Sequence, residues 1–208
     1  MNLKSSSDIS EWILNQREVF SILDNIKMYF FIKGLDNNFI WVNKSLAQAI
    51  GKHQEELINK EADDAFRNCE ETFDFSEYRK DDLEVIKTKL PKSDIIEQLP
   101  TIHGTRWVRT TKLPLLNIKN NTIGIIGISI DITDQYVLNK EFELLLDSLS
   151  DSLLITDHNG IILKVYKGKT GLITNYDEYV GKNINFLFAS VEFSTKVSEH
   201  LSKCAEFS

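Results

Sequence analysis

The sequence Gly124-Ile125-Ile126-Gly127-Ile128-Ser129-Ile130-Asp131-Ile132-Thr133-Asp134 decides the fold of this chain. Its apolar residues recur at every second position, which predicts a β-strand. Farther on, to about residue 149, the apolar residues have the spacing of one helix face: Leu138, Phe142, Leu145 and Leu149. Neither proline nor glycine separates the two patterns, so the strand is predicted to run directly into a helix that could transmit a displacement.

The two faces of this predicted strand differ in character. Four isoleucines share one face: Ile126, Ile128, Ile130 and Ile132. An antiparallel strand with one solvated face does not carry four large apolar side chains outward. If Gly127 and Ser129 face the helices of the domain, the isoleucine face needs a cover of its own. An N-terminal helix or a partner subunit is the natural cover.

The beginning of the chain predicts a helix and a hairpin. Asp8 and Glu11 have the spacing of a capping box, and an apolar stripe follows as far as Leu23, so an amphipathic helix opens the chain. Residues 29–33 and 39–42 are two short apolar runs separated by a turn sequence, which indicates a β-hairpin.

The middle of the chain predicts more helix and then more strand. Short helical pieces follow the hairpin, and a longer helix begins at Ser76, places Leu83, Ile86 and Leu90 on one face, and stops at Pro91. Three strand-like segments complete the unit: residues 93–99, 105–115 and 122–133. This order predicts an α+β fold, a five-stranded antiparallel sheet with helices gathered on one face.

An internal repeat extends past the strand-to-helix junction. Leu23-Asp24 recurs 123 positions later as Leu146-Asp147, and the same offset pairs the hairpin and its following helices with a second copy. The second copy lacks the three C-terminal strands, so we expect a fragment of a longer protein. The expected parts are an N-terminal helix over residues 1–22, a first domain over 23–134, a linker helix over 135–149 and an incomplete second domain over 150–208.

Composition and charge limit the class of protein. The net charge is −7, so this segment is not expected to bind nucleic acid or an anionic membrane surface. No apolar run is long enough for a bilayer span, and a cytoplasmic location is expected. Cys69 and Cys204 are expected to be reduced, structural thiols because their spacing suits neither a disulfide framework nor a zinc site.

The sequence resembles the PAS family of sensory domains over nearly all of residues 20–134, and again over 144–208. The resemblance is carried by residues 29–33, 39–43, 81–86, 105–109 and 127–133, and in the second copy by 154–162. It implies a cytosolic signal-input module, often a homodimer, that precedes an output domain such as a histidine kinase of a two-component system, a cyclic-nucleotide enzyme or a DNA-binding domain. We expect any dimer to use the N-terminal helix and the outer face of the sheet.

The resemblance also implies a pocket between the sheet and the helices. Val108, Thr110 and Lys112 would face it together with Ser129 and Lys33, making a mixed apolar and polar site for an unknown small molecule, such as a small anion or carboxylate. The remaining pocket candidates are Phe31, Trp41, Leu57, Ile86, Ile125 and Gly127. Alternatively, the lysine tips lie at the rim of a filled core.

No cofactor, metal site or catalytic site is expected. Cys69 lacks the sequence context of a flavin-binding cysteine, and Ser129 stands where such proteins carry a glutamine. His200 is the one histidine placed where haem-binding relatives use one, but a lone helix histidine is usually a surface or packing residue. The acidic residues between 61 and 74 lack metal-loop spacing, and no phosphate loop or nucleophile motif occurs.

The function predicted from the sequence is a sensory module that passes its state through a helix to an effector domain. The residues expected to relay the state are Asp131, Thr133, Leu138, Phe142 and Leu145. A ligand-free scaffold for dimerisation is the alternative. A large cavity would favour the sensor and a filled core the scaffold.

Overall fold

The computed structural model describes residues 5–70, 72–150, 152–167 and 178–189. The chain divides into two units, residues 1–134 and 135–208. None of the described helices is both long and apolar enough to cross a membrane.

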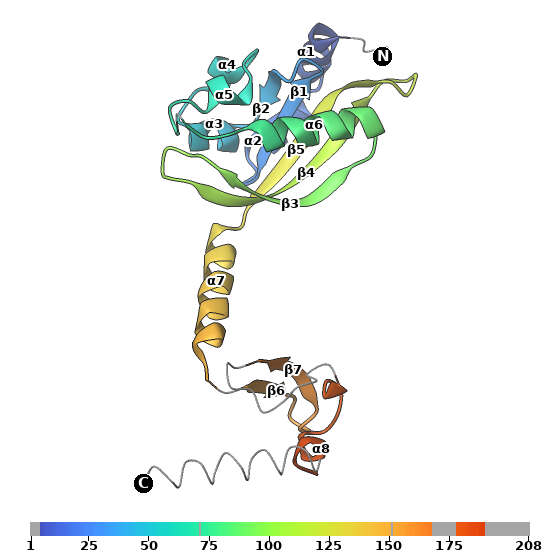
Figure 1. Ribbon diagram of the computed structural model, residues 1–208. Coiled ribbons are helices and arrows are strands. Elements are labelled where there is room, and N and C mark those ends of the chain that lie inside the picture. Colours follow the sequence, from blue (N-terminus) through green and yellow to red (C-terminus); the bar gives the residue numbers. More distant parts are fainter. Residues whose placement is uncertain (1–4, 71, 151, 168–177, 190–208) are drawn as a thin grey trace. The chain divides into compact units, whose positions relative to one another are not determined.

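The first unit is built on a five-stranded antiparallel sheet (Figure 1). Its strands are β1 (Tyr29–Gly34), β2 (Phe39–Val42), β3 (Lys92–Leu99), β4 (Arg106–Leu116) and β5 (Thr122–Asp131). Their order in the sheet is β2-β1-β5-β4-β3, so the isoleucine-rich strand β5 lies in the centre, between β1 and β4. The predicted α+β fold class is confirmed.

Four helices cover the inner face of this sheet: α3 (Lys44–Ile50), α4 (Gln54–Leu57), α5 (Ala62–Ala65) and α6 (Ser76–Thr88). Asn43 joins the hairpin to α3, because its side-chain oxygen accepts hydrogen bonds from the backbone N–H of Leu46 and of Phe30, each at 3.1 Å. Helix α6 lies along β4 and β5 (Figure 1). The core between these layers contains Phe39, Val42, Leu46, Ile50, Leu57, Phe66, Phe75 and Val108.

Two N-terminal helices cover the outer face. The expected single helix is broken at Gln16 into α1 (Ser6–Asn15) and α2 (Arg17–Asp24). The cap also differs from the prediction: Ser5, not Asp8, is the N-cap, and Asp8 is the acidic residue three positions later that closes the capping box. Ile9, Ile13 and Phe20 of these helices pack with Ile32, Ile40 and Ile123 of the sheet. Of the predicted isoleucine face, Ile126 packs against this cluster, whereas Ile130 is 38% exposed, so the N-terminal helices cover only the beginning of that face.

Helix α6 buries a different face from the one predicted. Leu83 and Leu90 are exposed, whereas Asp81, Asp82 and Val85 are the buried residues. The prediction failed because it assigned the apolar side chains to the core, whereas α6 places a carboxylate there that is paired with buried lysines.

In the second unit, β6 (Leu153–Thr156) and β7 (Ile162–Tyr166) form a hairpin, and α8 (Ile184–Ala189) follows. The pairs Leu154–Val165 and Ile155–Lys164 repeat the pairs Phe31–Val42 and Ile32–Trp41 of the first unit at the same 123-residue offset. The irregularity after Ile32 in β1 also recurs after Ile155 in β6. The two hairpins therefore share one register, as the repeat predicts. His200 and Cys204 lie outside the described residues.

Candidate functional site

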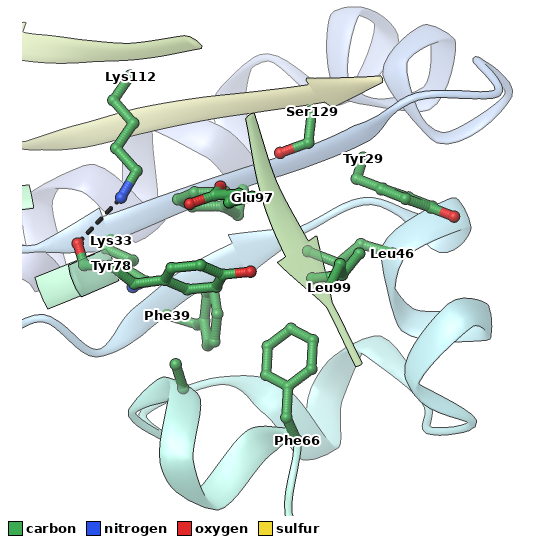
Figure 2. A pocket seen from close by; sticks show the side chains of 12 residues that line it. Tyr29, Lys33, Phe39, Leu46, Phe66, Tyr78, Glu97, Leu99, Lys112 and Ser129 are labelled. Carbon is green, nitrogen blue, oxygen red and sulfur yellow. Dashed lines mark hydrogen bonds between the residues drawn. The ribbon is translucent and has the colours of Figure 1, made fainter. Parts of the chain in front are cut away.

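A cavity of about 30 Å³ lies between the sheet and helices α3–α6. Five aromatic residues, three aliphatic residues and four polar or charged residues surround it. Its lining consists of Tyr29, Phe31, Lys33, Phe39, Leu46, Ala62, Phe66, Tyr78, Glu97, Leu99, Lys112 and Ser129 (Figure 2). A volume of roughly 10–15 Å³ holds one water molecule, so this cavity has room for a water or two and for nothing larger without movement of its walls.

Two buried lysines share one buried carboxylate beside this cavity. Lys33 Nζ lies 2.8 Å from Asp82 Oδ2, and Lys112 Nζ lies 2.7 Å from Asp82 Oδ1. All three side chains are no more than 3% exposed. The contact at Oδ2 is a hydrogen bond, whereas Oδ1 accepts none from the described residues and is held by the ion pair alone. The alternative that the lysine tips lie at the rim is therefore wrong.

The surroundings of the two ammonium groups complete the cluster. Lys112 reaches from β4 to α6 and donates a hydrogen bond to the backbone oxygen of Tyr78 at 2.9 Å (Figure 2). Lys33 Nζ lies 5.1 Å from the ring centre of Phe39 and 5.5 Å from that of Phe31. Cation–π attraction of this kind is strongest in a desolvated site, so these rings add to the stabilisation of Lys33.

Burial shifts the ionisation of three groups in the cluster. It lowers the pKa of Lys33, although the Asp82 carboxylate acts in the opposite direction. It raises the pKa of Glu97, against the effects of Lys112 and a hydrogen bond from Thr110. It also raises the pKa of Tyr78, with the carboxyl groups of Glu97 and Asp82 acting in the same direction. Ionisable groups with shifted pKa values around a cavity mark a candidate functional site.

The row Phe31–Gly127–Lys112 crosses the centre of the sheet below the cavity. The Phe31 ring lies directly on Gly127, where a Cβ atom would overlap it. The ring also meets Phe39 edge to face, with 5.8 Å between the ring centres. Gly127 is therefore needed for close approach of an aromatic ring to β5, and the position of that ring determines how much space the cavity has.

Four of the residues proposed from the sequence line the cavity: Phe31, Lys33, Lys112 and Ser129. Thr110 lies behind the wall, where its hydroxyl shares a hydrogen bond of 2.8 Å with that of Ser129. The other inner-face candidates do not line it: Leu57, Val108 and Ile125 are buried in the core, and Ile86 is half-buried on α6.

Trp41 was assigned to the wrong face of the sheet. It pairs with Ile32, and both side chains pack with α1 and α2 on the outer face. An irregularity in β2 is the physical reason: Ile32 pairs with Trp41 and Lys33 with Phe39, so Ile40 is skipped and the alternation is interrupted. Ile40 and Trp41 both lie on the outer face, whereas Phe39 lines the cavity.

Sequence reasoning missed the acidic half of the cluster. Asp82 and Glu97 were not proposed, because an acidic residue on a helix or strand usually faces solvent. Tyr78 was not proposed either. A usable signal was present: two lysines predicted to face a core require buried counter-charges. Candidates for those counter-charges were the acidic residues of β3 and α6, the elements that lie next to β4 and over it.

The end of β5 is fastened to β4 at the first residues of the proposed relay. The backbone N–H of Trp107 donates to Thr133 Oγ1 at 2.9 Å, and the N–H of Ile132 donates to the Trp107 oxygen at 2.8 Å. Asp131 Oδ1 accepts from the Thr133 N–H and hydroxyl, at 2.9 and 2.6 Å. These bonds lock the turn from which helix α7 (Thr133–Ser148) begins.

The remaining relay candidates lie along α7, which has no buried residue. Leu138 and Leu145 are each 65% exposed, so they contact little of the chain. Phe142 packs edge to face on Tyr166 of β7, with ring centres 5.8 Å apart. The helix is therefore attached to the second unit's hairpin through an aromatic contact.

The described residues contain no cluster of three histidine, cysteine, aspartate or glutamate side chains able to hold a metal ion. Cys69 is half-buried next to the Ile50 carbonyl, and burial raises the pKa of its thiol. A raised thiol pKa opposes formation of a reactive thiolate.

Comparison with known families identifies the fold. A model described as PAS fold matches residues 23–137, more than half of the chain, and a model described as PAS domain matches residues 150–207. The chain belongs to the PAS family, and its second copy is partial. PAS domains are in general regulatory sensor modules. No curated relative matches the chain.

Solved structures with the same fold are distant in sequence. An RNA-binding light-oxygen-voltage receptor is 14% identical, with a TM-score of 0.52 over 64% of this chain and 37% of that one. A Vibrio cholerae VqmA–ligand–DNA complex is 20% identical, with a TM-score of 0.48 over 62% of this chain and 59% of VqmA. A PAS domain from Colwellia psychrerythraea is 18% identical, with a TM-score of 0.47 over 59% of this chain and 98% of that one. The chain thus spans less than two thirds of VqmA, and the likeness shows the fold alone.

These neighbours correct the exclusion of nucleic acid. That exclusion rested on the net charge of −7, but a solved protein with this fold is a receptor described as RNA-binding. The acidic charge of these 208 residues therefore does not rule out nucleic acid as a partner of a protein with this fold.

Proposed function

We propose that the chain is a signal-input module whose first PAS domain binds a small molecule with an anionic group on an apolar body. The single observation that carries this proposal is the cluster of Lys33, Lys112, Asp82 and Glu97 beside a cavity that aromatic rings enclose. No haem or flavin is part of the proposal.

Charge balance favours an anionic ligand. Two ammonium groups share the Asp82 carboxylate, and burial favours the neutral form of Glu97, the second carboxyl group. Burial also lowers the pKa of Lys33, so one positive charge is in excess only when both lysines are protonated and Glu97 is neutral, which is the state we propose for ligand binding. A ligand carboxylate beside Lys112 would compensate that charge with short, charge-assisted hydrogen bonds.

Ligand entry requires Phe31 to move, because about 30 Å³ does not hold an organic acid. The Phe31 ring rests on Gly127, which has no side chain of its own. Rotation of this ring away from Gly127 would open space between Lys33 and Lys112. Ligand binding would therefore move the Phe31 ring from its position on Gly127 to another position at the centre of the sheet.

The signal would leave through β5. Ser129 lines the cavity, and Asp131 and Thr133 follow on the same strand and at the start of α7. Displacement of β5 relative to β4 would strain the bonds between Thr133 and Trp107. We propose that α7 passes this change to the second PAS domain and from there to an output domain of unspecified type.

The test uses benzoate as the probe on the full chain, with benzamide as its neutral analogue. Benzoate should raise the unfolding temperature, and benzamide should bind at least tenfold more weakly. Ala62→Val narrows the cavity, since Ala62 lines it, and should abolish the benzoate shift. Ala49→Val is the matched control, because Ala49 is half-buried on α3 but does not line this cavity.

A ligand-free scaffold is the second candidate function, and the small cavity volume is the observation that favours it. Native mass spectrometry of the purified chain separates the two. Retained mass that Ala62→Val removes supports the sensor. Bare protein, together with no benzoate shift, supports the scaffold.

A further inference from the structure

A second, larger hollow lies on the other face of the sheet. It has a volume of about 180 Å³, is partly open to the surface, and is bordered by helices α1 and α2 on one side and by strands β1, β2 and β5 on the other. Its principal walls are Trp12, Phe20, Leu23, Phe30, Trp41 and Ile126. The hollow is therefore about six times as large as the cavity beside the lysines.

The chemistry of this hollow is almost purely apolar. No residue of its lining is titratable, and the Gln16 amide and the two indole N–H groups are the only polar side-chain groups in that lining. A water molecule in a protein interior needs two to four polar partners, so water is poorly held here. An apolar ligand is better matched to these walls.

The walls are held apart by aromatic contacts. Phe20 meets Trp12 edge to face with 5.6 Å between ring centres, and meets Trp41 with 4.8 Å between ring centres. Phe20 is only 7% exposed, so it is fixed between the two tryptophans. The rings of Trp12, Phe20 and Trp41 connect α1, α2 and β2, and the hollow lies beside them.

We propose that this hollow binds a small neutral molecule of the size of a single aromatic ring. Apolar cavities of roughly 150 Å³ in proteins take up benzene, and this hollow is of similar size and is richer in aromatic walls. It is too small for a helix, and neighbouring positions on the outer face are already filled by Ile9 and Ile13 of the same chain. The occupant is therefore a small molecule.

This site is distinct from the cavity of the proposed function and lies on the opposite face of the sheet, although Phe31 contributes to the lining of both. Ile126 faces the hollow from β5, while its neighbours Ile125 and Gly127 belong to the inner face, where the Phe31 ring rests. One strand thus has a charged cavity on one side and an apolar site on the other.

Toluene is the probe, applied to the full chain. The three tryptophans give separate indole N–H signals in a ¹H–¹⁵N spectrum, assigned by single Trp→Phe variants. Trp12 and Trp41 line the hollow, whereas Trp107 lines neither site. Toluene should shift the signals of Trp12 and Trp41 in a saturable manner and leave the signal of Trp107 unchanged. The toluene affinity should be the same at pH 6 and pH 8.

Val19→Phe is the blocking variant, because Val19 lines the hollow from α2 and is 51% exposed, so a larger side chain there does not disturb the core. It should weaken toluene binding at least tenfold. Val137→Phe on α7, where Val137 is 44% exposed, is the matched control and should leave the affinity unchanged.

Three outcomes would overturn the proposal. They are the absence of saturable shifts, equal shifts of all three indoles, and unaltered toluene affinity in a folded Val19→Phe chain. A Val19→Phe variant that changes the oligomeric state but not toluene binding would make the hollow an interface between copies, which also overturns it. Because benzoate and toluene are blocked by different variants, failure of one site does not imply failure of the other.

Discussion

Replacement of Asp82 by asparagine tests the central feature of the first unit, the carboxylate shared by two buried lysines. The change keeps the size of the side chain and removes both ion pairs, of 2.8 and 2.7 Å. Breaking a buried pair by removing one partner costs about 3–5 kcal/mol, because a charge is left without compensation. For a unit of this size that loss lowers the unfolding temperature by about 12–20 °C.

Tryptophan fluorescence is the assay of choice for this variant. The three tryptophans of the chain, Trp12, Trp41 and Trp107, all lie in residues 1–134. Their signal therefore follows unfolding of the first unit while the second unit is still attached to it. Urea unfolding at fixed temperature gives the free energy, and a thermal scan gives the midpoint.

Asp81→Asn is the matched control, since Asp81 is the neighbouring acid on the same helix. Its partner, Lys92, is 34% exposed and also pairs with Glu84, so solvent screens the interaction. Partly exposed pairs of this kind contribute about 0–1 kcal/mol. The two substitutions are chemically identical and should differ by several kcal/mol only if burial of the charge is the cause.

The pH dependence of Asp82→Asn provides a second signature. Burial already lowers the pKa of Lys33, and loss of the carboxylate removes the main opposing effect, so that pKa falls further. The folded state then binds fewer protons than the unfolded chain between the lowered pKa and about 10.4, and stability rises with pH across that window. The deficit of the variant should therefore shrink as the pH is raised.

A triple variant determines whether charge or packing is responsible. Lys33→Met, Asp82→Leu and Lys112→Met together replace the cluster by apolar side chains of similar volume, which is often neutral or stabilising by about 1–4 kcal/mol. Recovery of stability in the triple variant would show that unpaired charge caused the loss. If Asp82→Asn costs no more than Asp81→Asn, or if the triple variant is equally unstable, the electrostatic reasoning is refuted.

Three further predictions concern single positions. Gly127→Ala should destabilise the first unit by about 1–3 kcal/mol in urea unfolding, because its Cβ would overlap the Phe31 ring, and no loss of stability would show that the ring moves freely. Glu97→Gln should raise the unfolding temperature at pH 7, and this gain should disappear below about pH 4, because the raised pKa makes ionisation of Glu97 unfavourable in the folded state. A difference in unfolding temperature that is the same at all pH values would contradict this. Thr133→Val should speed hydrogen exchange at the Trp107 amide, whose acceptor it removes, while costing only about 1 kcal/mol; unchanged exchange would count against the fastening of β5.

The backbone of the first unit was largely predictable from its apolar patterns. The alternation in residues 122–133 located β5, and the 123-residue repeat predicted two hairpins that prove to have the same register. These elements follow from periodicity because each buries one face along a regular direction. The break at Gln16 was not visible, since the apolar stripe continues from α1 into α2.

The polar half of the site could not be read in the same way. Periodicity assigns charged residues to the surface, so α6 was oriented by Leu83 and Leu90, and Asp82 was overlooked. A buried carboxylate is tolerable only when cations meet it, and those cations, Lys33 and Lys112, come from strands distant in sequence. The pairing is a property of the assembled sheet, which no local pattern contains.

Under the proposed function, the Phe31 ring beside the charged cluster is the element that would switch the inner site. Coupling between sites requires an element with two discrete arrangements, and a rigid core alone does not provide one. Under the proposed function Phe31 would be such an element: the ring rests on Gly127 in the structure, and the two ammonium groups bordering the cavity would favour an anion if the ring moved. The ring and an anionic ligand would compete for the same space beside β5. Under the proposed function, the affinity for the ligand is therefore limited by the free energy of displacing Phe31, and substitutions that weaken its packing on Phe39 should raise that affinity without touching a charged group.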